Sequence, residues 1–296
     1  MKPPPFEYYR ATTVEEATAL LSQYGPDAKI LAGGQSLLPM MKFRLARPSV
    51  LVDLHWVRDL AYVRQTDETV AFGAMARLAE LDSDQVRALC PILAEAASHI
   101  GHPPIRHRGT VCGSLAHADP AAELPVLALA LDAELVATGP NGARMMPADD
   151  FFVAMLTTSL GPSEVLTEAR FPVLRPGSGW GFSELSRRPG DFAIVAAAAT
   201  LRVGAAGTIT TARIALGAVA DRAIRCLDAE GALLGQRGDK AAFKAAAVLA
   251  SAPLTPPSDV HAPSGYRRHL AKVLVERALT QAWQRLNSTP SSVASS

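Results

Sequence analysis

Two short segments rich in small residues are the places where this chain could bind an anion. Gly33-Gly34-Gln35-Ser36 follows a short apolar run, and Gly109 to Ser114 lies in a longer stretch, Arg106 to Pro120, that begins with basic residues. Glycine has no Cβ, so backbone N–H groups in such turns can approach a phosphate closely. Within one α/β domain, the two segments together could hold a ligand that contains a pyrophosphate.

Other chemistries have weaker support in the residues. Gly33-Gly34 matches neither a dinucleotide-binding fingerprint nor a phosphate-binding P-loop. The alternative to an anion site is a plain strand-to-helix turn in which a glycine supplies a positive φ. Cys112 could be a reactive thiol, but packing is favoured where a small residue is wanted. Arg187-Arg188 could clamp an anion or be an exposed or salt-bridged pair at a strand end. Four histidines cluster with a spacing that fits no zinc signature, which favours turn and surface positions over a metal site: His99, His102, His107 and His117. We therefore predict no catalytic residues and no metal ligands.

Composition excludes several classes of protein. The chain has 296 residues, 49% of them hydrophobic and 19% charged, with a formal net charge of +1. This balance suits a globular protein and points to neither nucleic acid nor a membrane surface as a partner. We see no apolar run that would span a bilayer and no secretory signal. The cysteines are odd in number and widely separated (Cys90, Cys112 and Cys226), which favours the cytoplasm.

The first part of the chain reads as a small βαβ-type unit. Thr13 and Glu16 form a capping-box pattern before a helix that ends at Gly25-Pro26. Strands are expected at 28–32 and 49–54, with a short helix at 37–45 between them. The first small-residue turn therefore follows directly on a strand.

The middle of the chain alternates strands and helices. We expect strands at 69–73, 133–138 and 164–171, with a turn at Pro140-Asn141-Gly142. A helix over 83–100 should divide at Pro91, and a buried helix should cover 121–131. Between these helices, Arg106 to Pro120 is expected to be a loop.

The last third predicts an α+β domain. Proline and glycine cluster at Leu174 to Gly179, which indicates a boundary. Strands are expected at 181–186, 192–203 and 208–219, with helix as the alternative for the alanine-rich 192–199. Helices at 226–234, 240–252 and 266–286 follow. Strands followed by helices favour an antiparallel sheet.

Three motifs, in this order, resemble the FAD subunits of molybdenum hydroxylases. Leu31 to Pro39, with Arg47-Pro48 and Leu51-Val52-Asp53, resembles the first flavin-binding segment. Ile105 to Ser114, continuing through Ala116 to Pro125, resembles the second. Arg187 to Ala193 resembles the opening of the C-terminal domain. The resemblance covers Pro3 to about Leu286 and is closest to the medium subunits of carbon monoxide dehydrogenase and of nicotine and quinoline dehydrogenases.

The resemblance implies an α+β fold: a vanillyl-alcohol-oxidase-type FAD-binding domain of two subdomains, then a C-terminal α+β domain with an antiparallel sheet and helices. The expected boundaries are 1–56 and 57–176 for the FAD-binding subdomains and 177–287 for the C-terminal domain, with a disordered tail at 288–296.

The resemblance also names the expected FAD contacts. Both turns would bind the pyrophosphate and ribityl chain through backbone N–H groups, two acidic residues would follow the second turn, and two apolar residues would lie near the flavin ring or adenine. The full set is Lys29, Ile30, Leu31, Ala32, Gly33, Gly34, Gln35, Ser36, Ile100, Thr110, Val111, Cys112, Gly113, Ser114, Asp119, Glu123 and Leu166.

Two positions depart from the family pattern. Cys112 stands where a glycine is usual, and a cysteine there would cost about 1–2 kcal/mol if the position needs a positive φ. Relatives often carry a lysine in the strand after the linker, whereas this chain has Ser183 and Glu184 and no lysine between Leu174 and Lys240. We therefore expect the charge that would stabilise reduced flavin to be absent or supplied by an arginine.

As a function, the resemblance implies an electron-transfer subunit. A large partner subunit would carry the molybdenum cofactor and hydroxylate an N-heterocycle or similar small molecule, and a small partner would carry two [2Fe–2S] clusters, in a dimer of heterotrimers. FAD in this chain would pass electrons to a quinone, oxygen or NAD. Two alternatives stay open: a self-sufficient flavin oxidoreductase of the same fold, and a non-enzymatic FAD-binding assembly protein.

Overall fold

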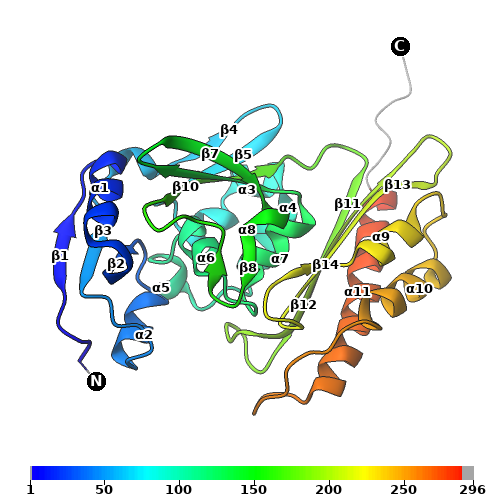
Figure 1. The fold of residues 1–296 in the computed structure, drawn as a ribbon. Coiled ribbons are helices and arrows are strands. Elements are labelled where there is room, and N and C mark those ends of the chain that lie inside the picture. The colour runs from blue at the N-terminus through cyan, green and yellow to red at the C-terminus, as the bar shows by residue number, and fades with distance from the viewer. Residues whose placement is uncertain (1, 289–296) are drawn as a thin grey trace. The chain divides into compact units, whose positions relative to one another are not determined.

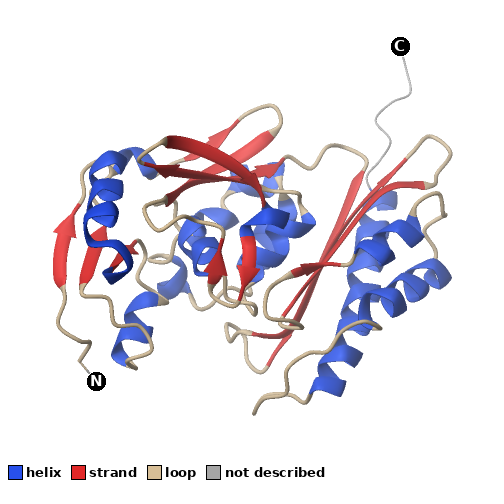
Figure 2. Ribbon diagram, viewed as in Figure 1, coloured by secondary structure: helices blue, strands red, loops and turns tan. Residues whose placement is uncertain are grey.

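The computed structural model describes residues 2–288, so most of the predicted disordered tail lies outside the described residues. The chain divides into two compact units, each assembled from three segments (Figure 1; Figure 2). The first unit comprises Met1–Cys90, Gly101–Asp119 and Asp132–Val173. The second comprises Pro91–Ile100, Pro120–Leu131 and Leu174–Ser296.

The first unit opens with a three-stranded parallel sheet in the order β1-β3-β2. Its elements are β1 (Glu7–Arg10), α1 (Val14–Tyr24), β2 (Ala28–Leu31), α2 (Leu37–Lys42) and β3 (Val50–Asp53). The expected βαβ arrangement is confirmed, because α2 connects two parallel strands. The edge strand β1 was not predicted; it pairs with β3 and so depends on residues far along the chain.

Helix α1 begins at the predicted cap. The Thr13 side chain accepts a hydrogen bond from the Glu16 N–H at 3.1 Å, which satisfies one of the unpaired donors at a helix start. The Glu16 carboxylate returns to Thr12 rather than Thr13, accepting from its N–H at 2.8 Å and its hydroxyl at 2.9 Å. The helix ends at Gly25, whose φ of +56° suits a residue without a Cβ.

A five-stranded antiparallel sheet, in the order β4-β5-β10-β6-β7, forms the rest of the framework of the first unit. Its strands are β4 (Val63–Gln65), β5 (Thr69–Gly73), β6 (Glu134–Gly139), β7 (Gly142–Pro147) and β10 (Val165–Pro172). The remaining elements are α3 (Asp84–Leu89), α5 (Pro103–Arg106), α6 (Val111–His117), α8 (Ala148–Phe151), and the pair β8 (Phe152–Ala154) and β9 (Thr157–Thr158), with 3₁₀ turns at Gly25–Asp27, Arg58–Leu60 and Leu78–Asp82.

The expectation that Arg106 to Pro120 forms a loop was wrong. The segment is mostly helical, with α5 ending at Arg106 and α6 occupying Val111–His117. Thr110 caps α6 with its side chain, so a threonine read as part of a turn is in fact a helix-start signal.

The second unit has a four-stranded antiparallel sheet in the order β11-β12-β13-β14, as predicted for the last third. Its strands are β11 (Ser178–Ser186), β12 (Ala193–Val203), β13 (Ile209–Gly217) and β14 (Ile224–Arg225), and its helices are α4 (Pro91–Ala97), α7 (Glu123–Ala130), α9 (Leu227–Leu233), α10 (Lys240–Ser251) and α11 (Ser264–Ser288). Within the described residues, no helix combines the length and apolar character needed to cross a bilayer.

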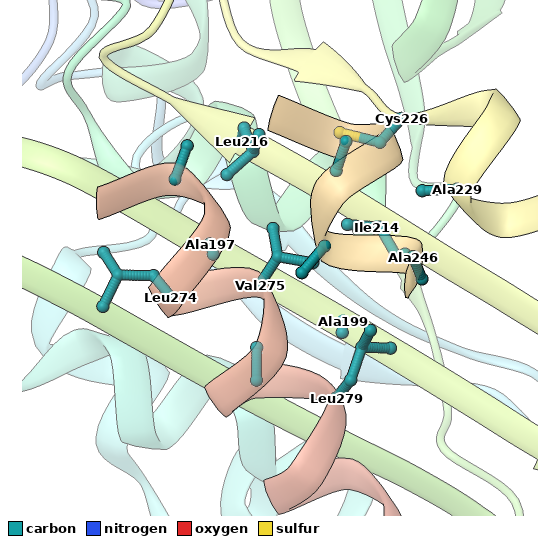
Figure 3. Packing of buried hydrophobic residues seen from close by; sticks show 14 of the residues in the cluster. Ala197, Ala199, Ile214, Leu216, Cys226, Ala229, Ala246, Leu274, Val275 and Leu279 are labelled. Atoms are coloured by element: carbon teal, nitrogen blue, oxygen red, sulfur yellow. The ribbon is translucent and has the colours of Figure 1, made fainter. Parts of the chain in front are cut away.

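The alanine-rich segment is a strand rather than the alternative helix, and it is buried on both faces. Successive side chains of a strand point to opposite sides. Ala197 and Ala199 pack under α11 in the cluster that contains Leu274 and Leu279 (Figure 3). The side chain of Thr200 points the other way and donates to the Ala130 carbonyl oxygen of α7 at 3.2 Å. Small residues therefore let helices approach from both sides.

Candidate functional site

The first small-residue turn connects β2 to α2 in the first unit. Gly34 has a φ of +70°, which most side chains disfavour, and the Gln35 amide donates to the Gly33 carbonyl oxygen at 3.1 Å. Among the described residues, the backbone N–H groups of Gly34, Gln35 and Ser36 donate to no protein acceptor. All three residues are partly exposed. The turn thus presents adjacent hydrogen-bond donors that a ligand could accept.

The second segment is the first turn of α6. The Thr110 hydroxyl oxygen accepts from the Gly113 N–H at 3.1 Å, and the Thr110 carbonyl oxygen accepts from the Ser114 N–H at 3.0 Å. The Thr110, Val111 and Cys112 side chains are buried, whereas Gly113 and Ser114 are partly exposed. A ligand could therefore meet the first three residues only through their backbone.

A neighbouring segment holds the start of α6 in place. The Leu78 N–H donates to the Gly109 carbonyl oxygen at 2.9 Å, and the Val111 N–H donates to the Ala76 carbonyl oxygen at 3.0 Å. Arg77, between them, forms a bridge with Thr110. Backbone bonds on both sides of Thr110 leave this turn little freedom.

The two segments touch each other through backbone, at what we call the glycine contact (Gly33 against Arg108 and Gly109). A Cβ placed on Gly33 would lie 2.4 Å from the Arg108 carbonyl oxygen and 2.6 Å from the Gly109 Cα, closer than real Cβ atoms come. A Cβ on Gly113 would lie 3.8 Å from that of Ala32. Position 33 thus requires glycine for space, and the structure brings together the two turns that the sequence singled out.

Positive charge gathers beside the glycine contact. Arg77 donates through Nη1 to the Arg108 carbonyl oxygen at 2.5 Å, and its Nη2 lies 3.4 Å from His55 Nδ1. Burial lowers the pKa of the Arg77 guanidinium, and the nearby Arg108 charge lowers it further. The Asp53 carboxylate acts on the Arg77 pKa in the opposite direction, so the positive charge of the two guanidiniums, which would favour an anion, is partly offset.

Cys112 does not have the strained backbone that would have made it costly. Cys112 lies inside α6 and its φ is not positive. The expected penalty of about 1–2 kcal/mol therefore does not apply. Its side chain is 2% exposed, with Sγ 3.5 Å from the Phe72 carbonyl oxygen. Burial raises the pKa of the thiol, so it packs rather than reacts.

The other predicted contacts in the first unit lie on the strands and helix around the contact. Lys29, Ile30 and Leu31 are on β2, paired with β3. Leu166 is buried on β10 next to a register shift, and α6 packs against that strand. Asp119 follows α6, and its charge partly offsets the lowering of the pKa of His117 that burial causes.

Two predicted contacts, Ile100 and Glu123, belong to the second unit. Ile100 closes the segment after α4 and is 7% exposed, and Glu123 is the first residue of α7 and is 5% exposed. A buried acid at a helix start is stabilised by the helix dipole.

Other candidate groups have ordinary surroundings. The Arg187 Nη1 lies 3.5 Å from His261 Nδ1, and both residues are exposed. Within residues 2–288, no three His, Cys, Asp or Glu side chains gather in a way that could hold a metal ion.

Sequence reasoning missed the environment of Glu184. Its side chain is 1% exposed, neither carboxyl oxygen has a hydrogen-bond partner, and burial raises its pKa to about 8, with the Glu123 charge adding to the shift. The alternation of β11 could have indicated an inward side chain, but the partners come from distant segments.

Comparisons with known proteins give matches over nearly the whole chain. Residues 4–174 match the family described as FAD binding domain in molybdopterin dehydrogenase, and residues 180–282 match the CO dehydrogenase flavoprotein C-terminal domain. The chain is 44% identical to the 6-hydroxypseudooxynicotine dehydrogenase complex subunit alpha of Paenarthrobacter nicotinovorans, over 99% of both chains. It superposes with a TM-score of 0.94 on a chain of carbon monoxide dehydrogenase from Hydrogenophaga pseudoflava, with 44% identity over 96% of this chain and 99% of that chain. For quinoline 2-oxidoreductase from Pseudomonas putida 86, the TM-score is 0.90, with 40% identity over 97% of this chain and 99% of that chain.

Proposed function

Because this chain belongs to the FAD-binding medium subunits of the carbon monoxide dehydrogenase family of molybdenum hydroxylases, we propose that it holds FAD at the glycine contact and passes electrons within such a complex. The observation that carries the proposal is the backbone approach of Gly33 to Arg108 and Gly109, which brings the free N–H donors of the first turn against the segment that leads into α6. The residues fit a pyrophosphate, since they offer N–H donors, small side chains and positive charge.

Each part of the contact would have its own role. The N–H groups of Gly34, Gln35 and Ser36 would donate to phosphate oxygens, and the exposed backbone at Gly113 and Ser114 would meet the ribityl chain. Arg77 would keep the Arg108 carbonyl turned toward itself and away from the anion. The boundaries 1–56, 57–176 and 177–287 remain our proposal for the domains, and Ile100, Asp119, Glu123 and Leu166 for further FAD contacts.

The proposal extends to an electron route through partner subunits. When bound, FAD supplies the chemistry that accepts electrons singly and releases them singly or in pairs. In our proposal a small subunit with [2Fe–2S] clusters supplies the electrons, a large molybdenum subunit hydroxylates the substrate, and a quinone, oxygen or NAD receives the electrons. The name of the 44% identical relative supports an N-heterocycle or similar small molecule as the substrate. We place the complex, a dimer of heterotrimers, in the cytoplasm.

Purification of the tagged full chain from its native cells tests the function. We expect a yellow preparation that carries FAD, together with a large molybdenum-containing and a small iron–sulfur subunit. The isolated chain should hydroxylate none of the candidate heterocycles. Turnover by the chain alone would favour the self-sufficient oxidoreductase, and a chain that stays colourless after incubation with FAD would overturn the proposal.

A further inference from the structure

Strand β11 of the second unit has two different faces. Successive side chains of a strand alternate, and a Cβ on Gly179 or Gly181 would clash with backbone carbonyl oxygens of α11, so the glycine face lies against that helix. Trp180, Phe182 and Glu184 therefore share the opposite face. This second face receives the segment 91–100, which contains α4 and contacts β11.

One attachment of the segment 91–100 to β11 is an ion pair. Glu95 accepts a hydrogen bond from the Arg285 guanidinium of α11 at 2.7 Å. The same guanidinium donates to the Trp180 carbonyl oxygen at 2.9 Å and lies over the Trp180 ring, 3.4 Å from its centroid. Both partners carry full charges near neutral pH, so this attachment is present whatever happens at the other end of the segment.

The other attachment, four residues further along the segment, is made of titratable groups. The His99 ring stacks edge-on against Phe182 with centroids 5.3 Å apart, and His99 Nδ1 lies 3.8 Å from Glu184 Oε1. The Glu184 side chain is 1% exposed, and among the described residues neither of its carboxyl oxygens has a hydrogen-bond partner. A movement of about 1 Å would bring the imidazole nitrogen within hydrogen-bond distance of the carboxyl.

The surroundings disfavour the charged form of Glu184. Burial raises its pKa to about 8, and the Glu123 charge adds to the shift. Burial lowers the pKa of His99, an effect that the Glu95 charge partly offsets. Strand β12 places Ala196 opposite Glu184, and α11 lies on the other face of β11. A protonated carboxyl that can donate to a neutral imidazole is therefore the stable arrangement near neutral pH.

We propose that His99 and Glu184 form a pH-sensitive latch that holds the end of the segment 91–100 on β11. The latch is closed while Glu184 is protonated and donates to His99 Nδ1. It opens when the Glu184 proton passes to solvent, because the carboxylate can be hydrated only if the segment moves away from the strand. A helix as short as α4 is marginal in water without packing, so the detached segment would also lose its helical hydrogen bonds.

The direction of the pH dependence follows from the two forms of the latch. In the open form Glu184 is hydrated and has its ordinary pKa of 4.5, whereas in the closed form it keeps its proton up to about pH 8. Above pH 6.5, the ordinary value for histidine, His99 is neutral in both forms. Between these limits each pH unit should favour opening about tenfold, and the effect should level off above pH 8.

Hydrogen exchange of the full chain, followed by mass spectrometry from about pH 6.5 to 9, tests the latch. The reporters are the amides of residues 98–100, each bonded to a carbonyl oxygen three residues earlier at 2.9–3.3 Å. Dividing the exchange rate of the unfolded chain at the same pH by the measured rate removes the pH dependence of the chemistry itself. We expect the protection of these amides to fall about tenfold per pH unit up to pH 8 and then to stay constant.

Three variants separate the latch from the rest of the packing. Glu184→Gln has no proton to lose and should remove the fall in protection. Glu95→Gln weakens the ion pair and should lower protection by a similar factor at every pH while the fall remains. His99→Phe keeps a ring beside Phe182 but has no nitrogen, so protection near pH 7 should be about threefold to tenfold lower than in the wild type.

Several outcomes would overturn the latch. A fall in protection that persists in Glu184→Gln would mean that another group titrates, and wild-type protection in His99→Phe would mean that the imidazole is not the partner. Residues 98–100 should also exchange faster than α10 at every pH; equal protection would show that only unfolding of the whole unit releases the segment. None of these measurements requires FAD, so the latch and the proposed function can fail separately.

Discussion

The glycine contact of the first unit is formed by backbone, whereas the surroundings of the buried acids of the second unit are formed by side chains. At the glycine contact, backbone meets backbone, and the essential property of Gly33 is that it has no side chain. Around Glu184, side chains from three segments create a site whose backbone is ordinary sheet and helix. A site made of backbone leaves a sequence signature in its glycines, whereas a site made of side chains is specified only by what folds against it.

Breaking the glycine contact should give the largest effect. Gly33→Ala places a Cβ 2.4 Å from the Arg108 carbonyl oxygen, so the two turns must separate. Overpacking costs about 1–3 kcal/mol, and we expect FAD affinity to fall by about a hundredfold, measured by fluorescence titration. Gly231→Ala is the matched control, because nothing lies within 4 Å of its added Cβ. Equal FAD affinity in both variants would refute a shared cradle.

The effect of replacing Glu184 on stability should depend on pH rather than on steric fit. Burial raises the pKa of Glu184 from 4.5 to about 8, so the folded chain binds a proton that the unfolded chain has released. This stability is present below pH 4.5 and is lost as pH rises toward 8. Relative to wild type, Glu184→Gln should therefore gain unfolding free energy as pH rises between these limits, by at most about 5 kcal/mol. Urea unfolding at several pH values measures the gain.

Ser183→Ala serves as the control for that experiment, since it lies on the same strand but faces α11. Its unfolding free energy should follow the pH dependence of the wild type. A Glu184→Gln variant whose pH profile runs parallel to the wild type would show that Glu184 is not protonated in the folded chain.

Removing the arginine that anchors the second turn should have a smaller effect. Arg77→Gln loses a charged hydrogen bond to the Arg108 carbonyl oxygen, which costs about 1–2 kcal/mol in a half-buried position. We expect the thermal midpoint to fall and FAD affinity to fall by about tenfold. Arg64→Gln, on the exposed edge strand β4, provides a comparison in which both quantities should stay near wild type.

The smallest effect should come from replacing Cys112 by the glycine that the family resemblance led us to expect in the second segment. Because Cys112 is helical, Cys112→Gly should lower stability by about 1 kcal/mol without improving FAD binding. The thiol of the wild type should react with a thiol reagent only after unfolding, because it is 2% exposed. Tighter FAD binding by Cys112→Gly would support the hypothesis that Cys112 strains the backbone, which its helical conformation contradicts.

Much of the fold followed from local signals. The Thr13 cap, the division of a helix at Pro91 and the hairpin turn before Gly142 each depend on residues a few positions apart, and each is confirmed. Strands such as β1 and β7 escaped prediction because they lie at sheet edges and most of their residues are exposed, so pairing rather than an apolar pattern defines them. The prediction of a loop at 106–120 was wrong because it overlooked Thr110 as the cap of a helix.

By itself, the sequence determined the two glycine segments, the order of many of the elements and the family they resemble. These depend on residue type, since glycine adopts the φ of Gly34 without the penalty of a Cβ and leaves room for the close approach at Gly33. Tertiary structure alone decided that Gly33 lies against Gly109, that Cys112 is helical, and that Glu184 is buried beside His99 and near Glu123. A pKa and a close contact depend on neighbours that are distant along the chain, and those neighbours are brought together only when the chain folds.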